Sequence, residues 1–180
     1  LNNKLLIVIY NKNIDLHCSM NIIIREAISK DMSKVLELIK ELATFEKEPD
    51  AVIVTEKQLI IDGFSSPPKF KCFVAEINQE IVGMALGYPR YSTWKGPTIH
   101  LEDLIVTKSK RGLGIGFKLF SKFIHYAHEL NVKRIEWVVL DWNKSAIDFY
   151  KKNGAHVLDD WKVAQMDFNA IKKFVNNEDF

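Results

Sequence analysis

The sequence contains little cysteine, little net charge and no long apolar run. Two cysteines, Cys18 and Cys72, occur among 180 residues, and no Cys/His group has zinc-ligand spacing. Lys and Arg number 25 against 23 Asp and Glu, a formal net charge of +2, without a block of five like charges. These absences argue against a disulfide framework, a metal site, and a surface for nucleic acid or a membrane. We expect a protein of the reduced cytoplasm.

The first nineteen residues differ from the rest of the chain. Their apolar run, Leu5 to Tyr10, is too short to span a membrane, and no small-residue cleavage site of a signal peptide follows it. Met20 is a candidate native start. We therefore expect residues 1–19 to be a non-native or disordered extension. Residues 20–180 should form one globular domain, because 47% of the chain is hydrophobic.

An apolar strand, a glycine-rich turn and a helix start follow one another between His100 and Phe117. Most residues of the segment 99–106 are β-branched or large and apolar, as in a buried strand. Gly112, Gly114 and Gly116 then remove three Cβ atoms, so several backbone N–H groups can converge beside the positive end of the next helix. This arrangement predicts an anion site, most naturally for phosphate.

The spacing of the glycines excludes two common phosphate loops. A dinucleotide loop needs Gly-x-Gly-x-x-Gly, and the third glycine arrives one residue early, at 116. A P-loop needs Gly-x-x-x-x-Gly-Lys-Ser/Thr, but Arg111 lies five residues before Gly116. The remaining pattern, Arg111-x-x-Gly114-x-Gly116, resembles the pyrophosphate loop of the GCN5-related N-acetyltransferases (GNAT), which bind acetyl-CoA. A glycine-rich turn without a ligand is the alternative.

Hydrophobic periodicity predicts a mixed α/β protein. The expected strands are residues 22–24, 70–77, 81–88, 99–106, 135–140, 157–158 and 161–168. The expected helices are residues 32–42, 55–61, 115–130 and 145–152, with a loop at 89–97 and a tail at 169–180. This order resembles the GNAT superfamily. The resemblance implies a single-domain fold with a mixed, mostly antiparallel central sheet flanked by helices. Its central strands, which end in Val106 and Leu140, are expected to splay apart.

A second motif covers Asp141 to Tyr150, Asp-Trp-Asn-Lys-Ser-Ala-Ile-Asp-Phe-Tyr. Asn143 and Tyr150 are seven residues apart, so two helical turns place them on one face. Taken alone, the segment is better explained as a capped amphipathic helix whose Phe149 and Tyr150 fill the core. It follows the glycine loop by about thirty residues, however, and is similar to the companion motif of the superfamily. We therefore favour a functional interpretation.

Most of the chain, from Ile22 to Trp161, resembles the diamine acetyltransferases, the spermidine/spermine and thialysine N-acetyltransferase group. The matching segments are Ile39-Lys-Glu-Leu-Ala, Thr55-Glu-Lys, Asp62-Gly-Phe, Tyr91-Ser-Thr-Trp-Lys-Gly, Leu101-Glu-Asp and Val139-Leu-Asp-Trp-Asn. This resemblance implies a homodimeric, acetyl-CoA-dependent N-acetyltransferase that needs no metal and acts on a small cationic amine.

The resemblance also implies roles for single residues, with Tyr150 as the general acid and Glu102 handling the amine proton. The implied cofactor contacts are Leu104, Ile105, Val106, Arg111, Gly112, Leu113, Gly114, Ile115, Gly116, Phe117, Asn143, Lys144, Ser145, Ala146 and Tyr150. The implied acceptor contacts are Phe45, Glu46, Glu102, Asp103, Glu136, Trp137, Val138 and Asp160. Two departures concern the acceptor: Phe45 replaces a usual tyrosine, and a shortened segment leaves Asp159-Asp160 where a glutamate is usual.

The chemistry of these residue types agrees with the implied roles. An alkylamine with a pKa near ~10.4 is protonated at pH 7 and cannot attack a carbonyl, so a carboxylate such as Glu102 must help remove the proton. A departing thiolate, with a pKa of roughly 8.5, benefits from a proton donor such as the Tyr150 phenol. The Leu104 to Val106 edge can donate N–H groups to the oxyanion. Neither cysteine is needed, so we expect direct transfer. A solvent-facing Glu102 is the alternative.

Acidic and aromatic residues predict a groove for the cationic acceptor. The acids are Glu46, Glu48, Glu102, Asp103, Asp141, Asp159 and Asp160, and the aromatic residues are Tyr91, Trp94, Trp142 and Trp161. For any one of them, an ordinary surface acid or core aromatic is the alternative. His100, His125 and His128 show no site spacing and are interpreted as structural. Protein or peptide acetylation and a non-catalytic acyl-CoA-binding module stay open as other functions.

Overall fold

The structure, a computed structural model, describes residues 21–176. The expected extension at residues 1–19 and Cys18 lie outside the described residues. The chain divides at Val138 and Val139 into two compact units. The first unit holds the sheet and the glycine loop, and the second holds the Asn143 to Tyr150 motif.

A five-stranded sheet forms the first unit. Its strands are β1 (Ile22–Glu26), β2 (Lys71–Ile77), β3 (Glu80–Ser92), β4 (Gly96–Val106) and β5 (Ile135–Glu136). They lie in the order of the sequence, and every neighbouring pair is antiparallel except β4 and β5, which are parallel. The expected mixed, mostly antiparallel sheet is thus confirmed.

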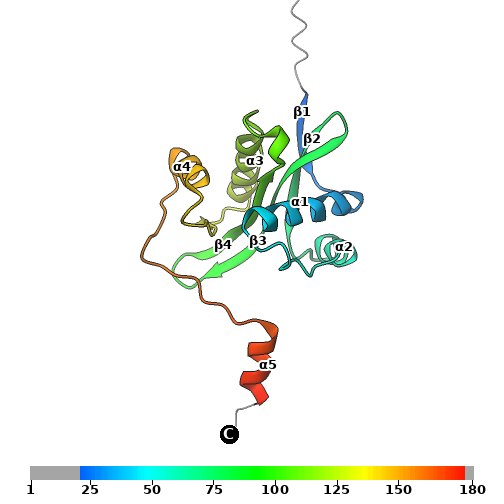
Figure 1. Ribbon diagram of the computed structural model, residues 1–180. Helices are drawn as coiled ribbons and strands as arrows, with labels where there is room; N and C mark the ends of the chain where they lie inside the picture. Colours follow the sequence, from blue (N-terminus) through cyan, green and yellow to red (C-terminus); the bar gives the residue numbers. More distant parts are fainter. Residues whose placement is uncertain (1–20, 177–180) are drawn as a thin grey trace, which may run out of the picture. The chain divides into compact units, whose positions relative to one another are not determined.

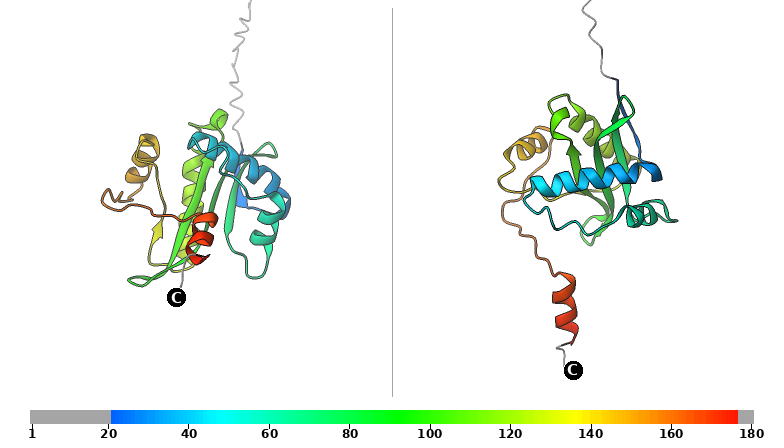
Figure 2. Two further views of the ribbon diagram at one scale, coloured as in Figure 1. Left: turned by 60° about the horizontal axis from the view of Figure 1, so that its bottom comes forward. Right: turned by 45° about the vertical axis from the view of Figure 1, so that its right-hand side comes forward.

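Helices cover both faces of this sheet. Figures 1 and 2 show α1 (Met32–Phe45) crossing one face and α3 (Ile115–Glu129) on the opposite face. On α1, Met32, Val35 and Leu38 recur at helical spacing and are at most 2% exposed. They share a core with Leu59 of α2 (Glu56–Phe64) and with apolar side chains of β2 and β3. The predicted helical periodicities are therefore confirmed.

The β3–β4 hairpin is longer than the sequence predicts. The expected loop at residues 89–97 is wrong for most of its length, because the ladder continues from Tyr88 opposite His100 to Ser92 opposite Gly96. The Ile99 N–H donates to the Arg134 carbonyl on the β5 side, 3.1 Å away. Pro89 lies opposite Ile99, whose backbone groups point away from β3. No N–H donor is therefore needed at residue 89, and proline is tolerated there. The proline consequently does not end the strand.

Strand β5 is shorter than predicted. Residues 135–140 were expected to be a strand, but only Ile135 and Glu136 pair with β4, opposite Ile99 and His100. From Leu101 onward, no strand among the described residues pairs with this edge of β4. The central sheet is therefore open along the second half of β4.

The second unit contains α4 (Lys144–Lys152) and α5 (Phe168–Asn176). The strands expected at 157–158 and 161–168 are wrong, since residues 139–176 contain no strand, and α5 occupies much of the expected tail. The apolar side chains that suggested strands are 56–68% exposed: Leu158, Trp161, Val163 and Met166. A strand needs a hydrogen-bonded neighbour, and alternation in one segment does not supply it.

We predict that Gly87→Ala destabilises the fold strongly. A Cβ at this β3 position would collide with the His100 carbonyl oxygen and with the buried Phe123 ring of α3. Neither can move freely, so we expect the free energy of unfolding to fall by about 2–4 kcal/mol. The control is Gly96→Ala, where a Cβ meets no atom within 4 Å and only the positive φ of +80° is strained, at a cost of about 1 kcal/mol. Urea unfolding should give this order, and equal losses would contradict the collision.

Candidate active site

The open edge of β4 presents backbone groups that no neighbouring strand of the described residues pairs. The Thr107 N–H donates to the Val82 carbonyl at 2.8 Å, and the Ile105 carbonyl also faces β3. Because backbone groups alternate in direction along a strand, Leu104 and Val106 direct theirs away from β3. Of the three residues expected to offer main-chain groups to a ligand, two are therefore oriented for it. The backbone of Ile105 is used inside the sheet.

The glycine loop joins this edge to α3. Gly112 and Gly114 have φ angles of +80° and +74°, so the loop requires glycine for its backbone conformation. Gly114 is the N-cap of α3, and no side chain caps the helix there. The first N–H groups of α3 therefore have no side-chain acceptor at the cap and can donate to an anion; the anion site itself stays a prediction.

Gly116 differs from the other two glycines. It lies inside α3 without a positive φ, and an added Cβ would only touch a Val106 methyl group at 3.8 Å. Neither backbone strain nor internal packing therefore demands glycine at this position. A bare backbone in the first turn of a helix lets an anion such as phosphate approach closely.

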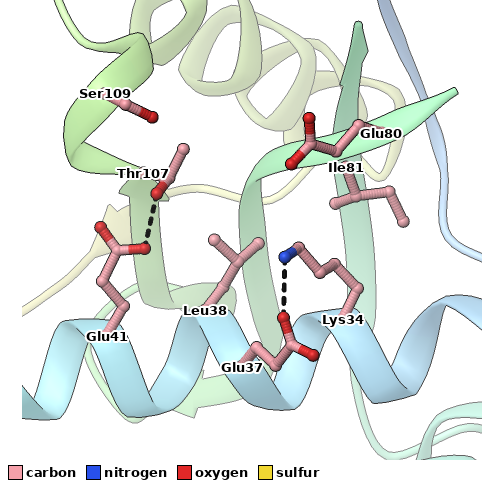
Figure 3. A pocket seen from close by; sticks show the side chains of 8 residues that line it. All are labelled: Lys34, Glu37, Leu38, Glu41, Glu80, Ile81, Thr107 and Ser109. Carbon is pink, nitrogen blue, oxygen red and sulfur yellow. Dashed lines mark hydrogen bonds and ion pairs between the residues drawn. The ribbon is translucent and has the colours of Figure 1, made fainter. Parts of the chain in front are cut away.

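Glu41 of α1 fixes the segment before the loop. Its carboxylate accepts from the Thr107 hydroxyl at 2.7 Å and from the Lys108 N–H at 2.9 Å, where the short helix η2 (Lys108–Lys110) begins. Figure 3 shows Glu41 pointing at Thr107, with the Lys34–Glu37 ion pair earlier on the same helix. Sequence reasoning missed Glu41, because the contact spans 66 residues and no local pattern announces it.

Arg111 connects the loop to the expected acceptor side. Its Nε donates to the Val106 carbonyl at 2.9 Å, which satisfies one backbone group of the open β4 edge. Its guanidinium also lies over the Phe45 ring, 5.4 Å from the centroid. A residue expected to contact the cofactor and a residue expected to contact the acceptor are thus neighbours.

Three acidic residues gather where β4 is irregular. The β3–β4 register shifts between Leu86, opposite Asp103, and Gly87, opposite Leu101, so Glu102 is the extra residue of a bulge. Its side chain is 50% exposed. Burial, together with the charges of Glu102 and Glu46, raises the pKa of Asp103 to about 7. Partial burial and the Glu102 charge likewise raise the pKa of Glu46.

No lysine or arginine of residues 21–176 forms an ion pair with these three carboxylates. We call Glu46, Glu102 and Asp103 the acidic cluster. It contains three of the seven acids that the sequence assigns to an acceptor groove. Of the other four, Glu48 is exposed beyond α1, and Asp141, Asp159 and Asp160 lie in the second unit.

The remaining expected acceptor residues of the first unit have other contacts. Glu136 forms ion pairs with Arg90 at 2.6 Å and Arg134 at 2.8 Å, so its charge is already compensated. Trp137 packs edge-on against Phe120 of α3, with ring centroids 5.7 Å apart. Val138 is 63% exposed. Glu136 therefore adds little negative potential for a cationic ligand.

Tyr88 and His100 are contacts of the acidic cluster that the sequence interpretation missed. The His100 Nε2 lies 3.5 Å from a Glu102 oxygen, and its ring stacks on Tyr88. Burial and a hydrogen bond to Glu102 raise the pKa of Tyr88. His100 was interpreted as structural. Its position two residues before Glu102, on the same side of a strand, is the signal that could have found it.

The second unit supplies the other motif. Asn143 caps α4 by accepting from the Ala146 N–H at 3.3 Å, and the Ser145 hydroxyl donates to the same oxygen at 3.2 Å. Tyr150, near the end of α4, is 8% exposed and packs edge-on against Phe149. Lys144 is exposed and bonds the Asp141 carbonyl. Asn143 thus caps α4, and the cofactor contacts of this helix stay predictions.

Burial raises the pKa of the Cys72 thiol to about 12, so a thiolate nucleophile is not available there. No group of three or more His, Cys, Asp or Glu side chains in residues 21–176 could hold a metal ion. None of the helices in this part of the chain has the length and apolar character that crossing a membrane requires.

The acetyltransferase (GNAT) family model matches residues 32–155, which include the glycine loop, the acidic cluster and α4. The chain belongs to this family. It is an acetyltransferase, and acetyltransferases of this family use acetyl-CoA.

Curated relatives agree with this assignment, and a solved structure shares the fold. Thialysine N-epsilon-acetyltransferase of Bos taurus is 39% identical over 163 residues, which cover 84% of this chain and 96% of that protein. Spermidine/spermine N(1)-acetyltransferase-like protein 1 of Homo sapiens is 36% identical over 139 residues, 73% of this chain and 20% of that protein. An integron cassette protein from the V. cholerae mobile metagenome has a TM-score of 0.72 at 23% identity, covers 88% of this chain and 99% of its own, and shows the fold alone.

We predict that Asp103 makes this acetyltransferase less stable as the pH rises. Since the folded-state pKa of about 7 exceeds the ordinary 3.8, the native state keeps a proton that the unfolded state has lost between these values. The free energy of unfolding should therefore fall by roughly 2–4 kcal/mol from pH 4 to pH 8 through this group. Asp103→Asn should remove this part of the dependence.

Urea unfolding at pH 5 and pH 8 measures the effect. The control is Asp148→Asn, which changes an exposed aspartate of α4 and should leave the wild-type dependence intact. Equal pH dependence in wild type and Asp103→Asn would contradict the crowding of charge at the acidic cluster.

Proposed function

We propose that this acetyltransferase transfers the acetyl group of acetyl-CoA to the primary amine of a small di- or polyamine or of a thialysine-like amino acid. The acidic cluster carries the proposal. Three neighbouring carboxylates without a Lys or Arg partner among the described residues create a negative potential that a cationic amine relieves. The names of the relatives, thialysine and spermidine/spermine acetyltransferases, support the same class of acceptor.

Glu102 is the proposed acceptor of the amine proton. An ammonium group at pH 7 has no lone pair for attack, and transfer of its proton to a nearby carboxylate exposes one. Glu102 suits this role because the bulge leaves its side chain half exposed, whereas Asp103 beside it is more buried and holds a proton more tightly. The proton moves from the amine nitrogen to a Glu102 oxygen, directly or through water.

The cofactor contacts follow from the backbone of the first unit. Acetyl-CoA, when bound, would supply the acetyl thioester. The N–H groups of Leu104 and Val106 are proposed to hold its acyl end and pantetheine arm, and those of residues 112–117 its pyrophosphate. Tyr150 is proposed to protonate the leaving thiolate, with Asn143 to Ala146 as further contacts. A homodimer in the cytoplasm stays a prediction from the resemblance.

We predict that Gly116→Ala separates cofactor binding from folding. A methyl group there fits the protein itself but occupies the space through which a phosphate would approach the first turn of α3. The free energy of unfolding should stay the same or rise by up to about 1 kcal/mol, because alanine favours helix. The Kd for CoA, measured by calorimetry, should rise at least about tenfold.

Gly114→Ala is the matched variant, since its positive φ strains alanine and should lower the unfolding free energy by about 1 kcal/mol. Wild-type affinity of Gly116→Ala for CoA would argue against a phosphate site in this turn.

We predict that Glu102→Gln and Tyr150→Phe each lower kcat/KM about 100-fold or more at pH 7 without unfolding the protein. The assay follows free CoA release over a panel of spermidine, spermine, short diamines, thialysine and lysine. Glu102→Gln should recover partly at high pH, where the amine loses its proton unaided. Glu129→Gln, an exposed acid at the end of α3, is the control.

The panel also tests the other functions. Release of CoA with lysine-containing peptides but with none of the small amines would favour protein or peptide acetylation. CoA binding without turnover of any amine or peptide would favour a non-catalytic acyl-CoA-binding module.

A further inference from the structure

Tyr88 and His100 form a stacked pair beside the acidic cluster. They lie directly opposite each other on β3 and β4, and their rings are 5.3 Å apart between centroids at an interplanar angle of 28°. The His100 side chain is 12% exposed. Both rings are therefore held in place by the sheet and by each other.

The polar groups of this pair converge on one carboxylate. The interaction with Glu102 contributes to the raised pKa of the Tyr88 hydroxyl, and the His100 Nε2 lies 3.5 Å from the Glu102 Oε2. The His100 Nδ1 is buried and has no hydrogen-bond partner in residues 21–176. Nε2 is consequently the nitrogen with a polar partner, and a small rotation of the half-exposed Glu102 side chain would close the separation.

The charges that face Glu102 from the elements around it are mostly negative. Glu46 follows the end of α1, and Asp103 is its neighbour on β4. The positive charge of Arg90, on the same strand as Tyr88, interacts with the Tyr88 hydroxyl, but Arg90 forms an ion pair with Glu136. Neighbouring carboxylates repel one another, so they do not all stay charged. Hydrogen bonds donated to a carboxylate favour its charged form.

We propose that Tyr88 and His100 are positioning residues for Glu102: the Tyr88 hydroxyl and the His100 Nε2–H both donate to its carboxylate and so fix its orientation. This inference rests on the proposed role of Glu102 in amine deprotonation. It assigns the pair no contact with the substrate. The amine proton still goes to Glu102, whose second oxygen is left to accept it.

Three variants distinguish hydrogen-bond donation to Glu102 from the packing of the two rings. Tyr88→Phe and His100→Phe keep a ring in each strand position and remove the donor, whereas His100→Gln keeps an N–H donor near Nε2 and cannot titrate as imidazole does. His125→Phe, at an exposed histidine of α3, is the control. Each is assayed with the amine that wild type acetylates fastest, and thermal unfolding confirms that each is folded.

We expect Tyr88→Phe and His100→Phe to lower kcat about tenfold with KM within about twofold, and to move the acid limb of kcat/KM about one pH unit higher. His100→Gln should stay within about threefold of wild type and keep its pH profile. An unchanged acid limb in either phenylalanine variant would overturn the inference. The inference would also be overturned if His100→Gln were as impaired as His100→Phe. In that case the reaction would need an imidazole at this position, and an N–H donor to Glu102 would not be enough.

A measurement on free wild-type protein needs no acceptor. Long-range ¹H–¹⁵N NMR correlations of the His100 ring at pH 8 should show the Nε2–H tautomer, and Glu102→Gln should shift these resonances. The Nδ1–H tautomer in wild type would refute donation to Glu102. If no amine of the panel were acetylated, the proposed function would fail while this measurement still tested the pair.

Discussion

The unequal hydrogen bonding of β4 is the constraint on which the candidate site depends. On one edge β3 pairs with β4 from Gly96 to Val106, but on the other β5 reaches only Ile99 and His100. Backbone groups in the middle of a sheet need partners, and the shortness of β5 leaves those of Leu104 and Val106 to other groups. Arg111 already bonds one of them, which shows that the edge binds a polar partner when one is near. The open edge and the uncapped start of α3 follow each other in the chain, so one continuous segment can hold both ends of a long ligand.

The distribution of positive charge explains why the acidic cluster is distinctive. Arg25 pairs with Asp31 and Glu76, and Arg90 and Arg134 pair with Glu136. These pairs neutralise carboxylates at other points of the sheet, while no Lys or Arg of residues 21–176 pairs with Glu46, Glu102 or Asp103. Leaving three acids together costs stability, as the raised pKa of Asp103 records. Such a cost is typical of binding sites, because a cationic ligand recovers it on binding.

The sequence predicted those features that depend only on residues close together in the chain. Gly112 and Gly114 need positive φ, Asn143 caps the next helix, and the apolar spacing of α1 and α3 buries one face of each; all of these can be read within a few residues. Pairing across the sheet could not be read in this way. The length of the β3–β4 hairpin depends on the opposite strand, the end of β5 on what lies beside it, and the convergence of Tyr88 and His100 on Glu102 on the β3–β4 register. The strands expected in residues 157–168 failed for the same reason, since alternation was present without a partner.

The bulge at Glu102 gives two adjacent acids different chemistry. In a regular strand, Glu102 and Asp103 would face opposite sides of the sheet, and only one of them could join a cluster with Glu46. The extra residue changes the direction of the strand locally, so that both interact with Glu46 while one is half exposed and the other more buried. Burial raises the pKa of Asp103, so this neighbour of the proposed general base tends to be neutral. A single irregularity in strand pairing therefore links the fold to the proposed proton transfer.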